Sequence, residues 1–164
     1  MKPRHLTLII ILLTSTRTFG CICGLETIQT VRQKSINSNE LIFIGQVVNS
    51  DTINGLFTLK IIKVFKGKLA DKVEASAAVD SVGTISSCSF SPSPHWGDTF
   101  IIYANPVKGT NRIYIDDCSA TRSISNPNIH LAYSASKLND KKQLRHAKKD
   151  LKEEFEILDK LNAR

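Results

Sequence analysis

The sequence has 164 residues and a formal net charge of +7, with 41% hydrophobic and 23% charged residues. This length allows one domain with a hydrophobic core but not two comfortable ones, and the composition excludes an intrinsically disordered chain. Three of the basic residues, Lys2, Arg4 and Arg17, lie in a leader without acidic residues, so removing it leaves +4. Most of that charge lies from Lys137 onward. The middle of the chain is therefore nearly neutral, and we do not expect it to bind nucleic acid.

Residues 1–20 have the pattern of a secretory signal peptide. A basic start is followed by the apolar run Leu6–Leu13, and the small residues Thr18 and Gly20 lie just before Cys21. A run of this length is too short to cross a bilayer as a helix, which needs about 20 residues. The alternative is a hydrophobic N-terminal core helix. We predict an exported, secreted protein without a transmembrane span, whose mature chain begins at Cys21.

The next part of the chain, residues 21–126, is rich in strand signals. A short helix is expected across Glu26–Ser35, where apolar residues recur at helical spacing. Five apolar, β-branched segments then predict strands at Leu41–Val48, Leu56–Phe65, Lys72–Ala77, Thr99–Ala104 and Arg112–Asp116. Gly45 is expected to bend the first of them. The fold class is therefore mainly β, a five-stranded Greek-key barrel of the OB type, with a sandwich as the alternative.

The segment Ala78–Pro94 is polar, is interrupted by glycine and proline, and contains Cys88. It predicts a connector between the third and fourth strands. His95 and Trp96 follow it directly. We expect Trp96 to cover one end of the barrel, and an exposed recognition site is the alternative.

Residues 127–164 have the character of a charged helical extension. Leu144, Leu151 and Leu158 recur at intervals of seven, which gives a long helix of roughly Ala135–Leu161 one narrow apolar stripe. We expect this stripe to pack on the barrel. The alternative is a helix that binds a partner or a second copy of the chain.

No motif of a known catalytic centre appears in the sequence. His95, His130 and His146 form no metal-binding pattern, no glycine-rich phosphate loop is present, and no serine lies in a nucleophile-elbow motif. Asp116 and Asp117 are neighbours at a strand end, where adjacent side chains point to opposite faces. We predict that the protein is not an enzyme and needs no cofactor.

Four cysteines follow the leader: Cys21, Cys23, Cys88 and Cys118. Export places them where disulfides form and persist. A bond between Cys21 and Cys23 would close a very tight ring, which leaves the two pairings that join both to Cys88 and Cys118. A four-cysteine zinc site is disfavoured, because such sites use close pairs with two to four residues between the ligands.

The Cys-x-Cys pattern at the new N-terminus suggests a chemical role. A free α-amino group has a pKa of about 7.7–8.0, so it can deprotonate near neutral pH and bind a metal ion. The carbonyl of the same residue completes a five-membered chelate. Two disulfides that leave Cys21 and Cys23 would hold such a terminus in place.

These residues resemble the tissue inhibitors of metalloproteinases and the wider netrin-like domains. The resemblance covers Cys21 to about Ser123 and rests on Cys21-Ile22-Cys23, on Ser38–Phe43 at the first strand and on Lys63–Gly67 at the end of the second. The positions of Cys88 and Cys118 also match the family's spacing.

The resemblance implies the pairs Cys21–Cys88 and Cys23–Cys118. It also implies that the amine and carbonyl of Cys21 bind the catalytic zinc of a metalloprotease and displace its water, and that Ile22 enters the specificity pocket. Cys23, together with segments near Ser86, Ser87 and Ser89, would contact the protease cleft. The zinc belongs to the target, so the inhibitor would carry no metal of its own.

The chain departs from the family in several ways. A further disulfide and the cysteine-rich C-terminal subdomain are missing, and Ile22 replaces a small hydroxyl residue. Two alternatives therefore stay open. One is a netrin-like module that binds another extracellular protein without inhibiting a protease. The other is a lipid anchor at Cys21, because Thr18–Cys21 loosely resembles a bacterial lipoprotein cleavage site.

Overall fold

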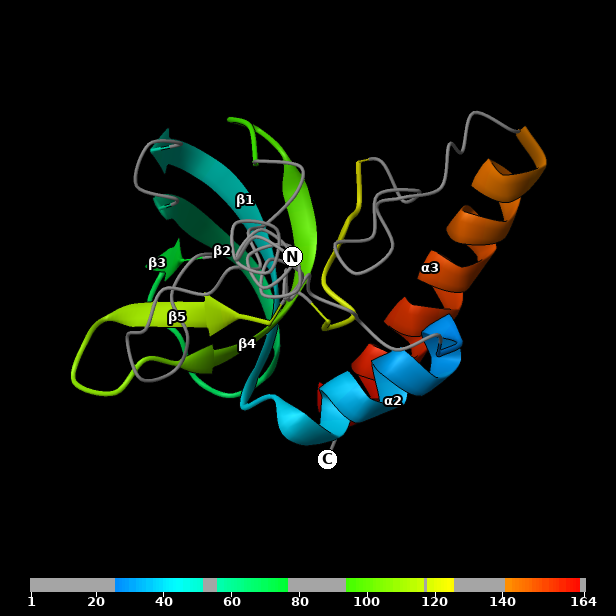
Figure 1. Ribbon diagram of the computed structural model, residues 1–164, viewed down its shortest axis with the longest axis horizontal. Helices are drawn as coiled ribbons and strands as arrows, with labels where there is room; N and C mark the ends of the chain where they lie inside the picture. The colour runs from blue at the N-terminus through cyan, green and yellow to red at the C-terminus, as the bar shows by residue number, and fades with distance from the viewer. Residues whose placement is uncertain (1–25, 52–55, 77–93, 117, 126–140, 163–164) are drawn as a thin grey trace, which may run out of the picture.

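Six strands and two helices make up the part of the chain that the computed structural model describes, residues 26–51, 56–76, 94–116, 118–125 and 141–162. Figure 1 shows their arrangement. In chain order they are α2 (Ile28–Ser38), β1 (Leu41–Asp51), β2 (Leu56–Lys66), β3 (Lys72–Ser76), β4 (Thr99–Pro106), β5 (Arg112–Ile115), β6 (Arg122–Ser123) and α3 (Lys141–Asn162).

Five of the strands form a closed barrel. Neighbouring strands follow the order β1-β2-β3-β5-β4, and a further pairing between β1 and β4 closes the ring. The β3–β5 pair is parallel, whereas the other pairs of the barrel are antiparallel. The prediction of a mainly β, OB-like barrel with a short first helix and a long last helix is confirmed. The alternative of a sandwich is wrong, because the pairing of β1 with β4 closes the five strands into a single ring.

A bend in β1 allows this closure. The strand pairs with β4 along Leu41–Gln46 and with β2 up to Asp51, and its register against β2 shifts between Ile44 and Gly45. A Cβ atom at Gly45 would lie 3.1 Å from Cε2 of Phe43 and 3.3 Å from side chains of two neighbouring strands. Glycine therefore fits the tightly packed inside of the bend, as the sequence predicted.

The barrel interior is an apolar cluster drawn from every strand of the barrel. Alternate residues of a strand point to opposite faces, so Phe43 and Ile102 point inward while Ile42 and Ile101 point outward. The buried members of the interior cluster are Leu41, Phe43, Val47, Phe57, Leu59, Val73, Ala75, Phe100, Ile102, Ala104, Ile113 and Ile115.

Both helices pack on one outer face of the barrel, as Figure 1 shows. Leu151 and Leu158 of α3 are buried in a second apolar cluster with residues of α2, β1, β2 and β4. The rings of Phe65 and Phe155 lie 6.5 Å apart. The part of the apolar stripe of α3 that contains Leu151 and Leu158 therefore packs on the barrel, as expected. Neither described helix is both long and apolar enough to cross a membrane.

The element boundaries differ slightly from the predictions. α2 starts later than predicted, because the side chain of Thr27 accepts a hydrogen bond from the N–H of Thr30 and caps the helix. β5 ends at Ile115 rather than Asp116. β6 was not predicted, since two residues are too few to give a strand pattern. The predicted start of the last helix near Ala135, and most of the connector to β4, lie outside the described residues.

Candidate functional site

Of the eight residues predicted to form or support the inhibitory site, the described part of the chain contains Cys118. It follows β5, and its backbone N–H donates to Oδ1 of Asp116 at 2.8 Å. Its sulfur takes part in a disulfide whose partner lies outside the described residues, so the pairing stays a prediction. The others, which also lie outside, are Cys21, Ile22, Cys23, Ser86, Ser87, Cys88 and Ser89.

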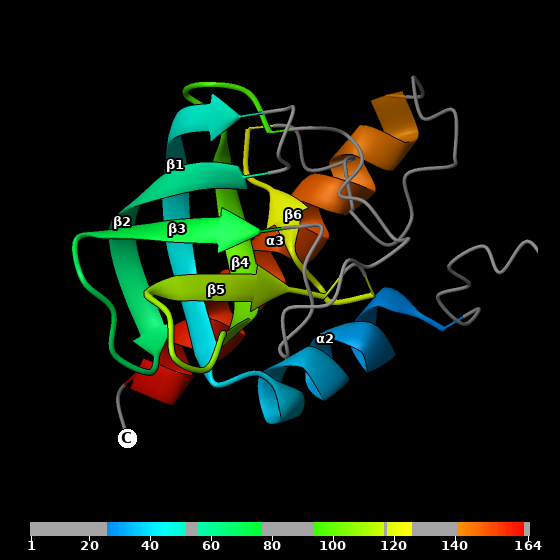
Figure 2. The ribbon, with the colours of Figure 1, turned by 60° about the vertical axis from the view of Figure 1, so that its left-hand side comes forward.

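The segment that follows Cys118 is fixed to α2 and to β4. The N–H of Ala120 donates to Oγ of Ser35 at 2.9 Å, and the N–H of Tyr103 donates to Oγ1 of Thr121 at 3.0 Å. All four of these residues are buried. α2 is the first described helix after the predicted N-terminal cysteines. In Figure 2 the arrowhead of β5 points to the side of the molecule on which α2 begins.

A cluster of buried charges joins the two helices to the barrel, and we call it the ionic cluster. It consists of Arg32 of α2, Tyr103 of β4, Arg122 of β6, and Asp150 and Glu154 of α3. Asp150 accepts from Nη2 of Arg32 at 2.9 Å and from Nη1 of Arg122 at 2.8 Å. Arg122 also forms an ion pair with Glu154. Oε1 of Glu154 accepts a hydrogen bond from the hydroxyl of Tyr103 at 2.5 Å. Each helix and the β4–β6 pair therefore contributes to one network.

Burial raises the pKa of two members of this cluster, Glu154 and Tyr103. Arg122 is 0% and Glu154 1% exposed. Removal from water raises the pKa of Glu154 above its ordinary value, although Arg122 and the hydroxyl of Tyr103 act in the opposite direction. The pKa of Tyr103 is also raised, first by burial and then by the nearby Glu154 carboxylate, so its hydroxyl stays a hydrogen-bond donor.

The ionic cluster was missed at the sequence level, although part of its pattern is visible. Glu154 lies three residues after Leu151 and four before Leu158, on the same face of α3. An acidic residue within an apolar stripe is a signal for a buried partner. No signal identified Arg122 as that partner, because it belongs to a strand of two residues. Four of its five members are buried and Asp150 is partly buried, which favours a structural role over chemistry on a substrate.

The turn around Trp96, unlike the ionic cluster, is exposed, and it corrects a prediction. Trp96 is 80% exposed, so it does not cover the end of the barrel. The turn is held against β1 by two backbone hydrogen bonds of 2.8 Å, from Gly97 to Val47 and from Val47 to Asp98. The N–H of His95 donates to Oδ2 of Asp98, also at 2.8 Å. A well-anchored turn therefore presents a large aromatic side chain to solvent.

Comparison of the chain with known proteins finds no match among family models and none among curated proteins. Within the described part, no three acidic, histidine or cysteine side chains are grouped to hold a metal ion.

Proposed function

We propose that this protein is an exported inhibitor of zinc metalloproteases. Its mature N-terminus would begin at Cys21, whose amine and carbonyl chelate the catalytic zinc of the target. The protein would supply no metal, perform no reaction and occupy the cleft in the place of a substrate. In this proposal Ile22 enters the apolar specificity pocket, and Cys23, Ser86, Ser87 and Ser89 lie against the walls of the cleft.

The observation that carries the proposal is the contact between α2 and the segment after Cys118. The Ala120–Ser35 hydrogen bond lies in a buried setting and ties these two parts of the chain together. α2 begins five residues after Cys23. A helix so placed supports a disulfide between Cys23 and Cys118, which would fix the terminal amine at the edge of the barrel. A fixed amine loses little conformational entropy on binding.

The chemistry of chelation favours this use of a free terminus. A catalytic zinc ion has three protein ligands and a water in its open position. A neutral amine replaces this water, which removes the nucleophile of the protease. Binding then requires the deprotonated amine, whose ordinary pKa is about 7.7–8.0. Inhibition should therefore weaken as pH falls below this range.

The test compares the mature protein beginning at Cys21 with a form that carries one additional alanine before Cys21. Both are refolded with disulfides formed and assayed against a panel of zinc metalloprotease catalytic domains with a fluorogenic peptide. We expect the extension to weaken inhibition at least 100-fold while the melting temperature stays unchanged, because the amine is displaced from the zinc. Equal inhibition by the extended form would exclude the chelation mechanism.

A second candidate function is favoured by the exposed Trp96. Exposed tryptophans are frequent anchors of protein–protein interfaces, and hydrogen bonds fix the backbone of the turn that carries this one. The protein would then be a netrin-like module that binds an extracellular partner without inhibiting a protease, and a lipid at Cys21 is compatible with this role. Mass spectrometry of the mature N-terminus separates the cases. A diacylglycerol adduct on Cys21 excludes chelation, whereas a free amine with two disulfides supports it.

A further inference from the structure

A pocket of about 330 Å³ opens at one end of the barrel. Strand β1 starts at this end, and the β2–β3 turn and the β4–β5 turn also lie there. It forms because the wall of the barrel is short here. β3 and β5 share three residue pairs, starting at Glu74 and Arg112, so the first part of β3 has no β5 residue opposite it. The interior cluster is therefore accessible from this end.

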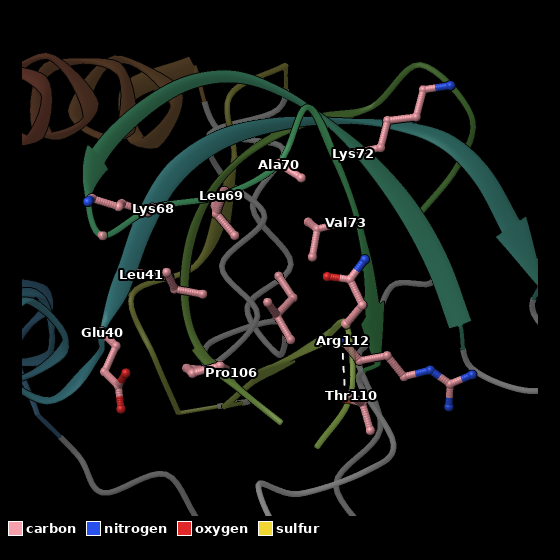
Figure 3. Close-up of a pocket in the computed structure, with 13 residues that line it drawn as sticks. Glu40, Leu41, Lys68, Leu69, Ala70, Lys72, Val73, Pro106, Thr110 and Arg112 are labelled. Carbon is pink, nitrogen blue, oxygen red and sulfur yellow. Dashed lines mark hydrogen bonds between the residues drawn. The ribbon is translucent and has the colours of Figure 1, made fainter. Parts of the chain in front are cut away.

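The inside of the pocket is apolar. Figure 3 shows the side chains of Leu41, Leu69 and Val73 pointing into the open space from three different segments. Leu41, Val73 and Ile113 belong to the interior cluster, and Leu69 packs against it. A cavity of about 150 Å³ lined by such side chains can bind benzene, so this pocket has room for one large apolar side chain.

Gly67 fixes the shape of the pocket at its β1 side. Its φ of +87° is a conformation that favours glycine, and a Cβ atom there would lie 2.6 Å from Cδ2 of Leu41 and 2.7 Å from the carbonyl oxygen of Glu40. The turn between β2 and β3 thus rests directly on the start of β1. The pocket is therefore formed in the folded protein without a change in this turn.

The rim of the pocket is positive. Lys68, Lys72 and Arg112 belong to its lining, with Glu40 as the one acidic residue among the described lining residues. In Figure 3 the charged groups of all four point away from the apolar centre. Arg112 pairs with Glu74 at 2.6 Å, whereas the two lysines have no ion pair in the described part of the chain. The rim therefore attracts an acidic partner.

We propose that this pocket binds one large apolar side chain of an acidic polypeptide segment from another protein. The apolar centre takes the side chain, and Lys68 and Lys72 attract the acidic residues on either side of it. A single-stranded nucleic acid fits less well, because none of the described lining residues is aromatic and bases bind on aromatic side chains. The pocket shares no residue with the predicted inhibitory site, so this proposal is independent of the inhibitor function.

The test is an NMR titration of the ¹⁵N-labelled mature protein with a short synthetic peptide that carries one central phenylalanine between acidic residues. We expect saturable shifts at Leu69, Ala70 and Val73. A matched peptide with alanine in place of phenylalanine should bind at least tenfold more weakly. So should a peptide with lysines in place of the acids. Equal binding of either peptide, or no binding of the first, would overturn the proposal.

Variants of exposed residues test the same assignment without disturbing the core. The double variant Lys68→Glu/Lys72→Glu should weaken binding of the acidic peptide at least tenfold at low salt, since it reverses two charges. Lys108→Glu, an exposed change in the neighbouring turn and outside the pocket, should change affinity less than twofold. Equal effects of these variants would contradict a local site.

Filling the pocket is the second arm of this test. Ala70 is exposed and lines the pocket, so Ala70→Trp should abolish the phenylalanine-dependent part of binding while the spectrum stays that of the folded protein. Ala70→Glu is the second variant, because an acidic group in the pocket repels the same peptide. Unchanged affinity in both, or tighter binding of an oligothymidylate than of the acidic peptide, would overturn the proposal.

Discussion

The barrel interior and the layer between the barrel and its helices are built in different ways. All buried members of the interior cluster are apolar. The outer layer combines an apolar cluster with the ionic cluster, in which Arg122 and Glu154 are buried at 0% and 1% exposure. Backbone hydrogen bonds hold the strands of the barrel in register, whereas two helices on an apolar face have no such constraint. The directional contacts of the ionic cluster therefore orient the helices.

Buried ion pairs are a poor source of net stability. Taking both charges out of water costs nearly as much as their attraction returns, and well-packed apolar residues often do as well or better. Loss of one partner is different, because it leaves a charge uncompensated in a dry environment. The ionic cluster should therefore contribute more to the placement of α2 and α3 than to the free energy of unfolding. Substitutions in both layers can separate these two contributions.

The largest effect is expected from Arg122→Met. This change leaves Glu154 buried without its ion pair and should lower the free energy of unfolding by about 3–5 kcal/mol, measured by urea denaturation. Asp150 keeps Arg32 as a partner at 2.9 Å. The double variant Arg122→Met/Glu154→Leu should recover most of the loss. A double variant as unstable as the single one would mean that the pair itself carries stability.

Leu158→Ala should cost about 2–5 kcal/mol, because Leu158 is fully buried between α3 and the barrel. Leu59→Ala, at an equally buried position inside the barrel, is the matched control and should cost a similar amount. The two should differ in native-state hydrogen exchange. Leu158→Ala should raise exchange mainly in α3, whereas Leu59→Ala should raise it throughout the barrel. The same exchange pattern in both variants would show that the two layers unfold as one unit.

The smallest effect is a pH dependence that Glu154 introduces. Folding raises the pKa of its carboxyl above the ordinary 4.5, so the folded protein binds more protons than the unfolded chain between these two values. Stability should therefore fall as pH rises from about 4.5 through the raised pKa. The variant Glu154→Gln should flatten this part of the profile of melting temperature against pH. The other members of the ionic cluster, Arg122, Arg32, Asp150 and Tyr103, stay in place in this variant. An unchanged slope would assign the dependence to another group.

Much of the barrel was readable from local sequence. Strands such as Leu56–Lys66 and Thr99–Pro106 carry β-branched and aromatic residues that suit a pleated, half-buried surface, so each segment shows its own preference. The apolar stripe of α3 likewise follows from Leu151 and Leu158, which lie on one helical face. The predicted inhibitory residues come from a sequence pattern, and Cys118 is the member of the set that the described structure places.

Contacts between residues far apart in the chain were decided by the tertiary structure alone. Arg32 and Asp150 are separated by 118 positions, and Tyr103 and Glu154 by 51. Local propensity carries no information on such pairs, because their energy exists only after the barrel has closed and both helices have packed on it. The same holds for Trp96, whose exposure depends on how its turn rests on β1, and for the pocket beside Gly67, which needs three distant segments to meet. The sequence by itself determined the five strands of the barrel, the apolar stripe of the last helix and the fold class. Long-range packing determined which charges are buried and which surfaces stay open.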